Sequence, residues 1–441
     1  MNDFNIIDYG ARRGEVCTRE IQSAFDAASA AGGKVVVPRG EFLTGTIDMG
    51  GASLYLEKGA VLKGSGNWAD YREVGYSHNE MGQVKSLLYT IAHEDVTVYG
   101  FGTIDLNGRA FYEADRPNVP EDQAARMTEA QRAECTLHYE HRPNQPIFFL
   151  NCRRVTVRDV HIVDAPCWTL SFVSCADVRV TDVTIDNGLN IPNCDGMHFC
   201  CSHDILVRGC RITAGDDCIA FTGITDWNTP CERAVVSDCV FQSASKAISI
   251  GYMHSIVRDI TVTNCVVTRS NRALVLMVSE GTGLIEEITL SNLRLDSRVY
   301  AGNWWGHGEP ICLMCVPHDS FNYRDKAPER RFPVSARRIL LQNVNCSGEN
   351  VIACVGVPGS VTDIHMDHVL YRRKDSENLL LRGHMVDLAP GAQTAILADD
   401  EHAWLYLRGI RNSSISRCFT EPWNDKKLEH IVLDCEAVTI D

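Results

Sequence analysis

Signatures of secretion and membrane insertion are absent from this sequence. Its first ten residues contain no basic start followed by an apolar run, which a secretory signal peptide requires. No segment approaches the roughly 20 consecutive apolar residues of a membrane-spanning helix. We therefore expect a cytoplasmic protein with no membrane partner, whose substrates are small enough to be imported.

Positive charge is in short supply. Lys and Arg number 42 against 57 Asp and Glu, which gives a formal net charge of −15. An acidic surface repels nucleic acids, anionic membranes and polyanionic polysaccharides, so we expect no nucleic-acid partner. Solubility alone is an equally good explanation of the charge. No feature of the sequence indicates an oligomeric state.

Several motifs of cofactor and metal chemistry are missing as well. The sequence contains no Walker motif, no HExxH and no nucleophile elbow. Its 19 cysteines are an odd number, and without a secretory signal they do not indicate a disulfide framework. Cys312 and Cys315 form a Cys-x-x-Cys pair, but no second pair lies at zinc-finger spacing. We expect no metal and no cofactor.

The strongest positive signal is an internal repeat. Each eleven-residue unit alternates apolar and polar residues, breaks at Asp, Gly, Asn or Ser, and alternates again, which is typical of two short strands joined by a bend. The first six units start 23 to 29 residues apart, and the last interval is 51. Repeats of this length without a helical period predict a solenoid of β-coils, with equivalent positions stacked about 4.8 Å apart. The units start at Val155, Val178, Ile205, Ala234, Ile260, Ile288 and Ile339.

The repeat also accounts for many of the cysteines. Its sixth position holds only Val, Leu or Cys, and free Cys behaves as a small buried hydrophobe. We therefore expect these residues to form an interior ladder rather than a redox or metal site. They are Val160, Val183, Cys210, Cys239, Cys265, Leu293 and Val344.

A helix is predicted ahead of the coils. Thr18 is a plausible N-cap, Ile21, Phe25 and Ala28 form one apolar face, and Gly32 follows as a stop signal. Such a helix would cover the open end of the solenoid.

Two stretches interrupt the repeat, at residues 107–146 and 299–335. Long loops in compact folds are often functional, and on a solenoid they would wall a groove. No low-complexity linker divides the chain, so we expect a single domain over residues 1–441 with these two insertions.

Acidic residues recur at the same phase of adjacent coils. Asp195 lies in Asn193-Cys194-Asp195-Gly196, and Asp216 and Asp217 follow about one coil later in Gly-Asp-Asp-Cys. We expect these carboxylates to cluster, and crowded like charges raise at least one pKa, which creates an acid and a base from one residue type. Glycoside hydrolysis requires that combination. The alternative is that these residues only form turns.

These aspartate motifs resemble those of the polygalacturonase family, glycoside hydrolase family 28. Asp-Tyr-Gly-Ala at 8–11, the segment at 32–38 and Gly-Phe-Gly-Thr-Ile-Asp at 100–105 add to the likeness, which covers nearly the whole chain. The resemblance implies an all-β, right-handed parallel β-helix and a glycosidase that hydrolyses with inversion. By position, it implies that Asp216 is the general acid and that Asp195 and Asp217 orient and deprotonate the attacking water. It also makes Asn193 a candidate for binding the substrate.

Two departures from the family pattern concern cations. Lys246 stands where the family has a histidine, and it keeps a positive charge near the carboxylates. Val275 and Met277 stand where the family has the Arg and Lys that grip a uronate carboxylate. Arg272 remains nearby and is a candidate to bind substrate as the missing cation, although a shift along the strand points it to the other face. The leaving-group subsite therefore fits a neutral sugar better than galacturonate.

Further candidates for sugar contact are aromatic or polar. Aromatic faces suit sugar stacking and polar groups suit hydroxyls, whereas packing of a loop or of the core, or a solvated arginine, is an equally good explanation of each. His198 fits a core residue better than a site residue. The candidates are Arg142, Trp168, Trp304, Trp305, His307 and Glu309.

Together these features predict an inverting, exo-acting glycosidase on small neutral glycosides or oligosaccharides, with long loops closing one end of the groove. A galacturonate-specific polygalacturonase or exo-galacturonidase is the first alternative. A non-catalytic carbohydrate-binding solenoid, a lyase or an epimerase is the second.

Overall fold

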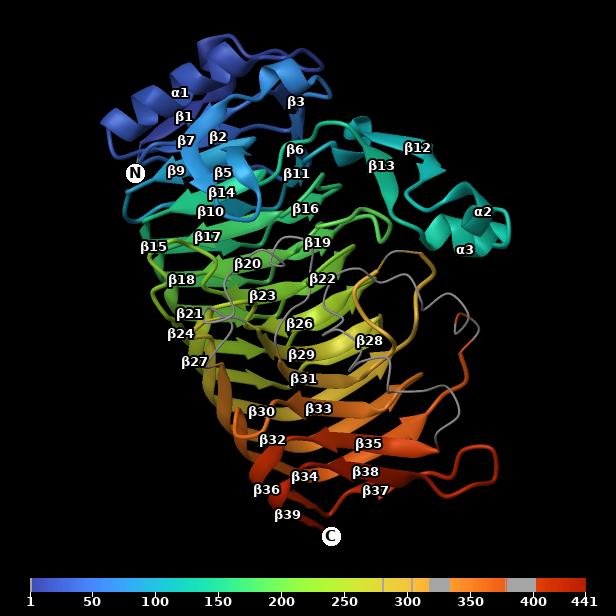
Figure 1. The fold of residues 1–441 in the computed structure, drawn as a ribbon. Helices are drawn as coiled ribbons and strands as arrows, with labels where there is room; N and C mark the ends of the chain where they lie inside the picture. Colours follow the sequence, from blue (N-terminus) through green and yellow to red (C-terminus); the bar gives the residue numbers. More distant parts are fainter. Residues whose placement is uncertain (1, 280, 303, 317–333, 377, 379–401) are drawn as a thin grey trace.

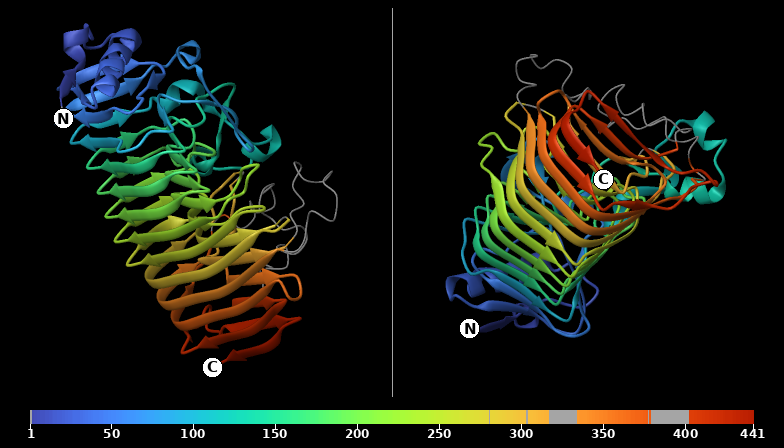
Figure 2. Two further views of the ribbon diagram at one scale, coloured as in Figure 1. Left: turned by 90° about the vertical axis from the view of Figure 1, so that its left-hand side faces the viewer. Right: turned by 90° about the horizontal axis from the view of Figure 1, so that it is seen from below.

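The protein is described by a computed structural model that covers residues 2–441, apart from 280, 303, 317–333, 377 and 379–401. The chain winds into a right-handed parallel β-helix, which confirms the predicted fold class (Figure 1). The N-terminal helix lies at one end, and the coils stack along the axis toward the C-terminus (Figure 2). Among the described residues, no helix is both long and apolar enough to cross a membrane.

One long face of the β-helix is a 12-stranded sheet in which every neighbouring pair is parallel. We call it the site sheet. Its strands are β4 (Ile47–Asp48), β9 (Leu88–Ile91), β14 (Ile147–Leu150), β17 (Leu170–Val173), β20 (Met197–Cys200), β23 (Ile219–Thr222), β26 (Lys246–Ile250), β29 (Arg272–Val278), β31 (Ile311–Cys315), β33 (Ile352–Gly356), β35 (Ala403–Arg408) and β38 (Glu429–Leu433).

The remaining faces form a 23-stranded sheet. Its strands are β1 (Asp3–Asn5), β2 (Lys34–Val37), β3 (Gly40–Thr44), β5 (Ser53–Leu56), β6 (Ala60–Gly64), β10 (Thr97–Gly100), β11 (Thr103–Asp105), β15 (Arg153–Arg158), β16 (His161–Val163), β18 (Ala176–Thr181), β19 (Thr184–Asp186), β21 (His203–Arg208), β22 (Arg211–Ala214), β24 (Cys231–Ser237), β25 (Val240–Ser243), β27 (Ile256–Thr263), β28 (Val266–Ser270), β30 (Leu284–Ser297), β32 (Ser335–Gly348), β34 (Val361–Arg373), β36 (Ile410–Ser416), β37 (Phe419–Thr420) and β39 (Glu436–Ile440).

The repeat seen in the sequence is the register of this second sheet. The first residue of each unit pairs with the first residue of the next, from Val155 with Val178 to Ile288 with Ile339. The long last interval therefore adds residues outside the ladder without shifting it. The sixth positions are buried throughout, from Val160 to Val344, which confirms the interior ladder. All 19 cysteines are free thiols.

The inward face of the site sheet carries a stack of phenylalanines. Phe149, Phe172, Phe199 and Phe221 occupy equivalent positions on successive coils, with ring centroids 4.9 to 5.5 Å apart. All four are fully buried. This stack fixes the spacing of the coils directly beneath the polar residues described below.

The helix α1 (Thr18–Ala30) covers the N-terminal end, and the buried face that was predicted is confirmed. The N-cap assignment was wrong, because Cys17 is the capping position and Thr18 is the first helical residue. The Thr18 hydroxyl instead accepts a hydrogen bond from the Gly45 N–H at 2.7 Å, so it fastens the helix to the coil below. Short 3-10 turns lie at Ile6–Tyr9 (η1) and Trp68–Asp70 (η2).

Several segments of the described chain leave the coils. The hairpin of β7 (Glu73–His78) and β8 (Gly82–Lys85) packs on the outer face of the site sheet. The stretch 107–146 folds into η3 (Gly108–Phe111), β12 (Tyr112–Pro117), α2 (Glu121–Ala124), α3 (Glu129–Glu134) and β13 (Leu137–Tyr139). It projects from the side of the β-helix (Figure 1). Of the stretch 299–335, residues 317–333 lie outside the described residues.

We predict that Phe199→Ala lowers the free energy of unfolding by about 3–5 kcal/mol, because it opens a cavity inside a continuous stack. The midpoint of guanidinium unfolding measures the loss. Phe101→Ala is the matched control, since Phe101 is 69% exposed and should change the midpoint little. Equal losses for the two variants would mean that the phenylalanine stack does not hold the coils together.

Candidate active site

The polar residues of the site stand in one column across adjacent coils. Met197 pairs with Ile219 and Ile219 with Ile248, so Asp195, Asp217 and Lys246, each two residues earlier, lie above one another. Backbone hydrogen bonds hold this register: Gly196 N–H donates to Asp217 O at 2.8 Å, and Cys218 N–H donates to Lys246 O at 3.1 Å. The column lies where the chain enters strands β20, β23 and β26.

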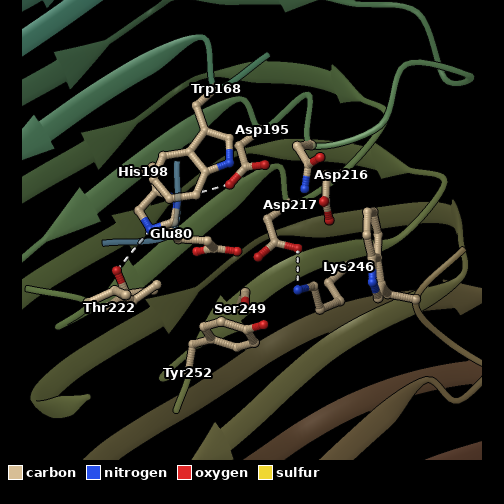
Figure 3. Close-up of a pocket in the computed structure, with 13 residues that line it drawn as sticks. Glu80, Trp168, Asp195, His198, Asp216, Asp217, Thr222, Lys246, Ser249 and Tyr252 are labelled. Carbon is tan, nitrogen blue, oxygen red and sulfur yellow. Dashed lines mark hydrogen bonds and ion pairs between the residues drawn. The ribbon is translucent and has the colours of Figure 1, made fainter. Parts of the chain in front are cut away.

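The column opens into a pocket with an empty volume of about 390 Å³ on the outer side of the site sheet (Figure 3). The structure thus brings the three predicted aspartates together, and it adds Asn193, Lys246, Trp168 and Trp305 from the predicted set. The lining residues are Glu80, Trp168, Asn193, Asp195, His198, Asp216, Asp217, Thr222, Ile224, Lys246, Ser249, Tyr252 and Trp305.

Asp195 is held by a buried histidine. His198 Nδ1 lies 2.9 Å from Asp195 Oδ2, and His198 Nε2 lies 2.8 Å from the Thr222 hydroxyl oxygen (Figure 3). The indole of Trp168 stacks on the imidazole with ring centroids 3.8 Å apart. Burial lowers the pKa of His198 well below its usual range, so the ring is neutral. The histidine therefore orients Asp195 through a hydrogen bond rather than a full ion pair.

The three carboxyl groups are all nearly inaccessible to water, with exposures of 3 to 6%. Burial, and then the charges of Asp216 and Asp217, raise the pKa of Asp195 well above its usual range. Oδ1 of Asp195 and Oδ1 of Asp216 are buried without a hydrogen-bond partner among the described residues. Crowding three such groups in one small pocket disfavours the fully ionised state, so we expect the cluster to retain a proton at neutral pH.

Lys246 influences which carboxyl group of the cluster carries the negative charge. Its Nζ lies 3.0 Å from Asp217 Oδ1, and both side chains are buried. Burial raises the pKa of Asp217 well above its usual range, and the ammonium of Lys246 acts in the opposite direction. The ammonium of Lys246 thus stabilises the carboxylate form of Asp217 against the effect of burial. Among the described residues, no lysine or arginine forms an ion pair with Asp195 or Asp216.

The rest of the pocket is partly aromatic. Trp305 and Tyr252 line it and also pack against an apolar cluster on the outer face of the site sheet. Val275 and Met277, which replace the family cations, belong to that cluster and are 0% and 3% exposed. Neither side chain lines the pocket, so these two positions contribute packing beside it and no cation to its wall.

Arg272 is not available as a binding cation, which corrects that prediction. Its guanidinium forms a fully buried pair with Glu309, with Nε 3.1 Å from Oε2 and Nη2 3.2 Å from Oε1. Glu309 also accepts a hydrogen bond from the His307 backbone N–H at 2.7 Å. Arg272, His307 and Glu309 thus fasten the loop that precedes β31 to the coil, and none of them lines the pocket.

Trp304 and Arg142 also differ from their predicted roles. Trp304 is buried and donates its indole N–H to Glu134 O at 2.7 Å, so it joins the loop that precedes β31 to the 107–146 insertion. Arg142 is buried behind the pocket and donates to Asn193 Oδ1 at 2.9 Å. The polar groups of both side chains donate hydrogen bonds to oxygens of the protein, so they are not directed at a sugar.

Sequence reasoning missed several lining residues. Glu80 comes from the turn of the β7–β8 hairpin, whose sequence carries no periodic signal that would place it over the column. Ser249 and Tyr252 lie three and six residues after Lys246 on the same coil, and the spacing of the repeat was sufficient to find them. His198, which was interpreted as a core residue, is both buried and part of the pocket wall.

No group of three or more His, Cys, Asp or Glu within the described ranges is arranged to hold a metal ion.

Comparison with known proteins identifies a family. The model of the family described as glycosyl hydrolases family 28 matches residues 28–301. A probable endopolygalacturonase of Aspergillus fumigatus is 28% identical over 151 residues, 32% of this chain and 38% of the relative. An exopolygalacturonase of Platanus acerifolia is 23% identical over 273 residues, 59% of this chain and 63% of the relative. The matches thus span less than two thirds of either relative.

Solved structures show a similar fold. The exopolygalacturonase of Thermotoga maritima superposes with a TM-score of 0.66 and 21% identity, covering 84% of this chain and 87% of that one. At this identity the likeness concerns the fold.

We predict that Lys246→Ala moves the acidic limb of the pH–activity profile to higher pH by about one unit or more. Removing the ammonium takes away the interaction that lowers the pKa of Asp217, so a higher pH is needed to ionise it. Initial rates across pH on any cleaved glycoside measure the shift. Lys246→Arg, which keeps a cation, is the control. An unchanged acidic limb in Lys246→Ala would show that Asp217 does not set it.

Proposed function

Because the chain belongs to glycosyl hydrolases family 28, we propose that it is an exo-acting glycosidase that hydrolyses O-glycosyl bonds with inversion at the anomeric carbon. The observation that carries this proposal is the placement of Asp195, Asp216 and Asp217 in one buried pocket from two adjacent coils. A pocket that binds sugar without hydrolysing it would gain nothing from crowding three acids. The substrate partner is a carbohydrate.

The proposed mechanism divides the acid and base roles among the three carboxyl groups. Asp216, which has no ion-pair partner among the described residues, would protonate the glycosidic oxygen as the bond breaks. Asp217, whose carboxylate form is stabilised by Lys246, would take a proton from the attacking water. Asp195, which is held in place by its hydrogen bond with His198, would orient that water. The water attacks the anomeric carbon opposite the leaving oxygen, which inverts the configuration.

The β7–β8 hairpin supports exo action. Val74 and Val84 of the hairpin pack on Phe148 and Leu150 of the outer sheet face, and Tyr76 stacks on Phe148 with centroids 5.6 Å apart. These contacts occupy the sheet on the N-terminal side of the pocket, where a longer sugar chain would otherwise extend. A chain end, rather than a chain interior, therefore fits the pocket.

The nature of the sugar has two candidates. The relatives named above are polygalacturonases, which supports galacturonan-derived oligosaccharides as substrates of this chain. A neutral terminal sugar is favoured by the lining: among the described residues it holds four carboxyl groups, from Glu80 and the three aspartates, and one ammonium, which is bound to Asp217. A uronate there would meet net negative charge.

The substrate is tested by incubating the protein with oligogalacturonides, polygalacturonate and chromogenic neutral glycosides in parallel. We expect one monosaccharide to be the initial product, and proton NMR of fresh product to show the inverted anomer. Galacturonate release would establish the first candidate, and a neutral sugar the second. Internal cleavage of polygalacturonate would refute exo action, and an unsaturated product absorbing near-ultraviolet light would indicate a lyase.

Replacing each aspartate by asparagine tests the roles. We predict that Asp195→Asn, Asp216→Asn and Asp217→Asn each lower kcat by about 10²–10⁴-fold, the usual contribution of a general acid or base. Asp216→Asn should also raise the melting temperature, since it relieves repulsion among buried carboxyl groups. The control is Glu41→Gln, an exposed acid on β3. Near-normal turnover in one aspartate variant would remove that residue from the mechanism, and sugar binding with no turnover in the wild type would indicate a binding module.

A further inference from the structure

Arg142 is a buried cation that is satisfied by uncharged oxygens. It is 7% exposed, and its guanidinium donates to the carbonyls of Pro166 (3.0 Å) and Pro192, to the Tyr112 hydroxyl and to Asn193 Oδ1 (2.9 Å). None of the ion pairs found among the described residues involves it. Burying a charge is costly unless every donor is used, so an arginine kept in this position has a geometric role.

The guanidinium joins the turns that carry the pocket residues. Pro166 lies two residues before Trp168, and Pro192 lies three residues before Asp195 on the next coil. Nη1 donates to both carbonyls while Nη2 donates to Asn193, so one planar guanidinium links the two turns to the amide. The ring of Tyr139 lies under the guanidinium, 4.0 Å from its central carbon, and it limits the guanidinium to one plane. The insertion at 107–146 thus braces the pocket from behind.

The same contact fixes which way the Asn193 amide points. A guanidinium only donates, so the carbonyl oxygen Oδ1 must face it, and the amide Nδ2 must point the other way. Asn193 lines the pocket beside Asp195. The NH₂ group of Asn193 is consequently free to donate a hydrogen bond on the side of the carboxyl groups. In the reverse orientation, this NH₂ group would face the guanidinium of Arg142, and two donors would meet.

We infer that Arg142 is a positioning residue that holds the Asn193 amide so that its NH₂ donates to an oxygen of the bound sugar. This inference rests on the proposed glycosidase function, but it holds for either sugar candidate, because hydroxyl, ring and glycosidic oxygens occur in both. Arg142 itself does not touch the sugar. It acts only through the orientation of Asn193.

Asn193→Asp tests the donor directly. The carboxylate has the shape of the amide and would pair with Arg142, so the turn should stay folded, but it offers the pocket an acceptor in place of a donor. We expect kcat/KM to fall by about ten-fold or more, mainly through a higher KM, with an unchanged melting temperature. A kcat/KM within two-fold of the wild type would overturn the inference.

A double-mutant cycle tests whether Arg142 acts through Asn193. We expect Arg142→Lys and Asn193→Ala each to lower kcat/KM, and the double variant to resemble Asn193→Ala within about two-fold. Losses that multiply in the double variant would show that Arg142 acts elsewhere. Tyr112→Phe is the matched control: it removes another partner of Arg142, leaves Asn193 untouched, and should keep kcat/KM within about three-fold.

The outcomes separate this inference from the proposed function. A wild-type protein that cleaves none of the substrates would refute the proposed function and this role with it. An active wild type with an unaffected Asn193→Asp variant would refute only the role of Asn193 and Arg142. If Arg142→Lys fails to fold, the Asn193→Asp result decides.

Discussion

The chemistry of this protein depends on the parallel register between neighbouring coils. Because each coil hydrogen-bonds directly to the next, residues at equivalent positions lie next to one another. Asp195, Asp217 and Lys246 therefore form one column. A buried phenylalanine stack lies beneath them and keeps the coils at this spacing. The scaffold therefore imposes the proximity of like charges, which would be unfavourable in a less rigid fold.

The proximity of the three carboxyl groups is electrostatically unfavourable, but it also provides an acid and a base. Burial and mutual repulsion favour a retained proton, and the ammonium of Lys246, which forms its ion pair with Asp217, acts in the opposite direction there. Acid and base thus arise from identical side chains through their surroundings. Two arginines near the pocket have other partners: Arg272 pairs with Glu309, and Arg142 donates to Asn193. They hold loops in place without neutralising the aspartates.

The sequence was sufficient to predict what depends on local period and coil spacing. Alternation in the repeat gave the strands, the unit starts gave the register of the 23-stranded sheet, and the one-coil spacing of Asp195 and Asp216 placed them together. Contacts made by loops could not be predicted in this way. The Arg272–Glu309 pair, the burial of Arg142 and the arrival of Glu80 from a hairpin all depend on three-dimensional loop paths that no periodicity encodes.

The central claim is that the aspartate cluster keeps a proton at neutral pH. Carbon-13 NMR of protein labelled at the aspartate side-chain carboxyl measures this directly, by titrating the wild type alongside an Asp216→Asn variant that identifies the cluster's signals. The account predicts at least one wild-type carboxyl that titrates well above the usual range of aspartate, about 3.9, and whose titration changes in the variant. If every aspartate of the wild type titrates below about pH 5, the account is contradicted.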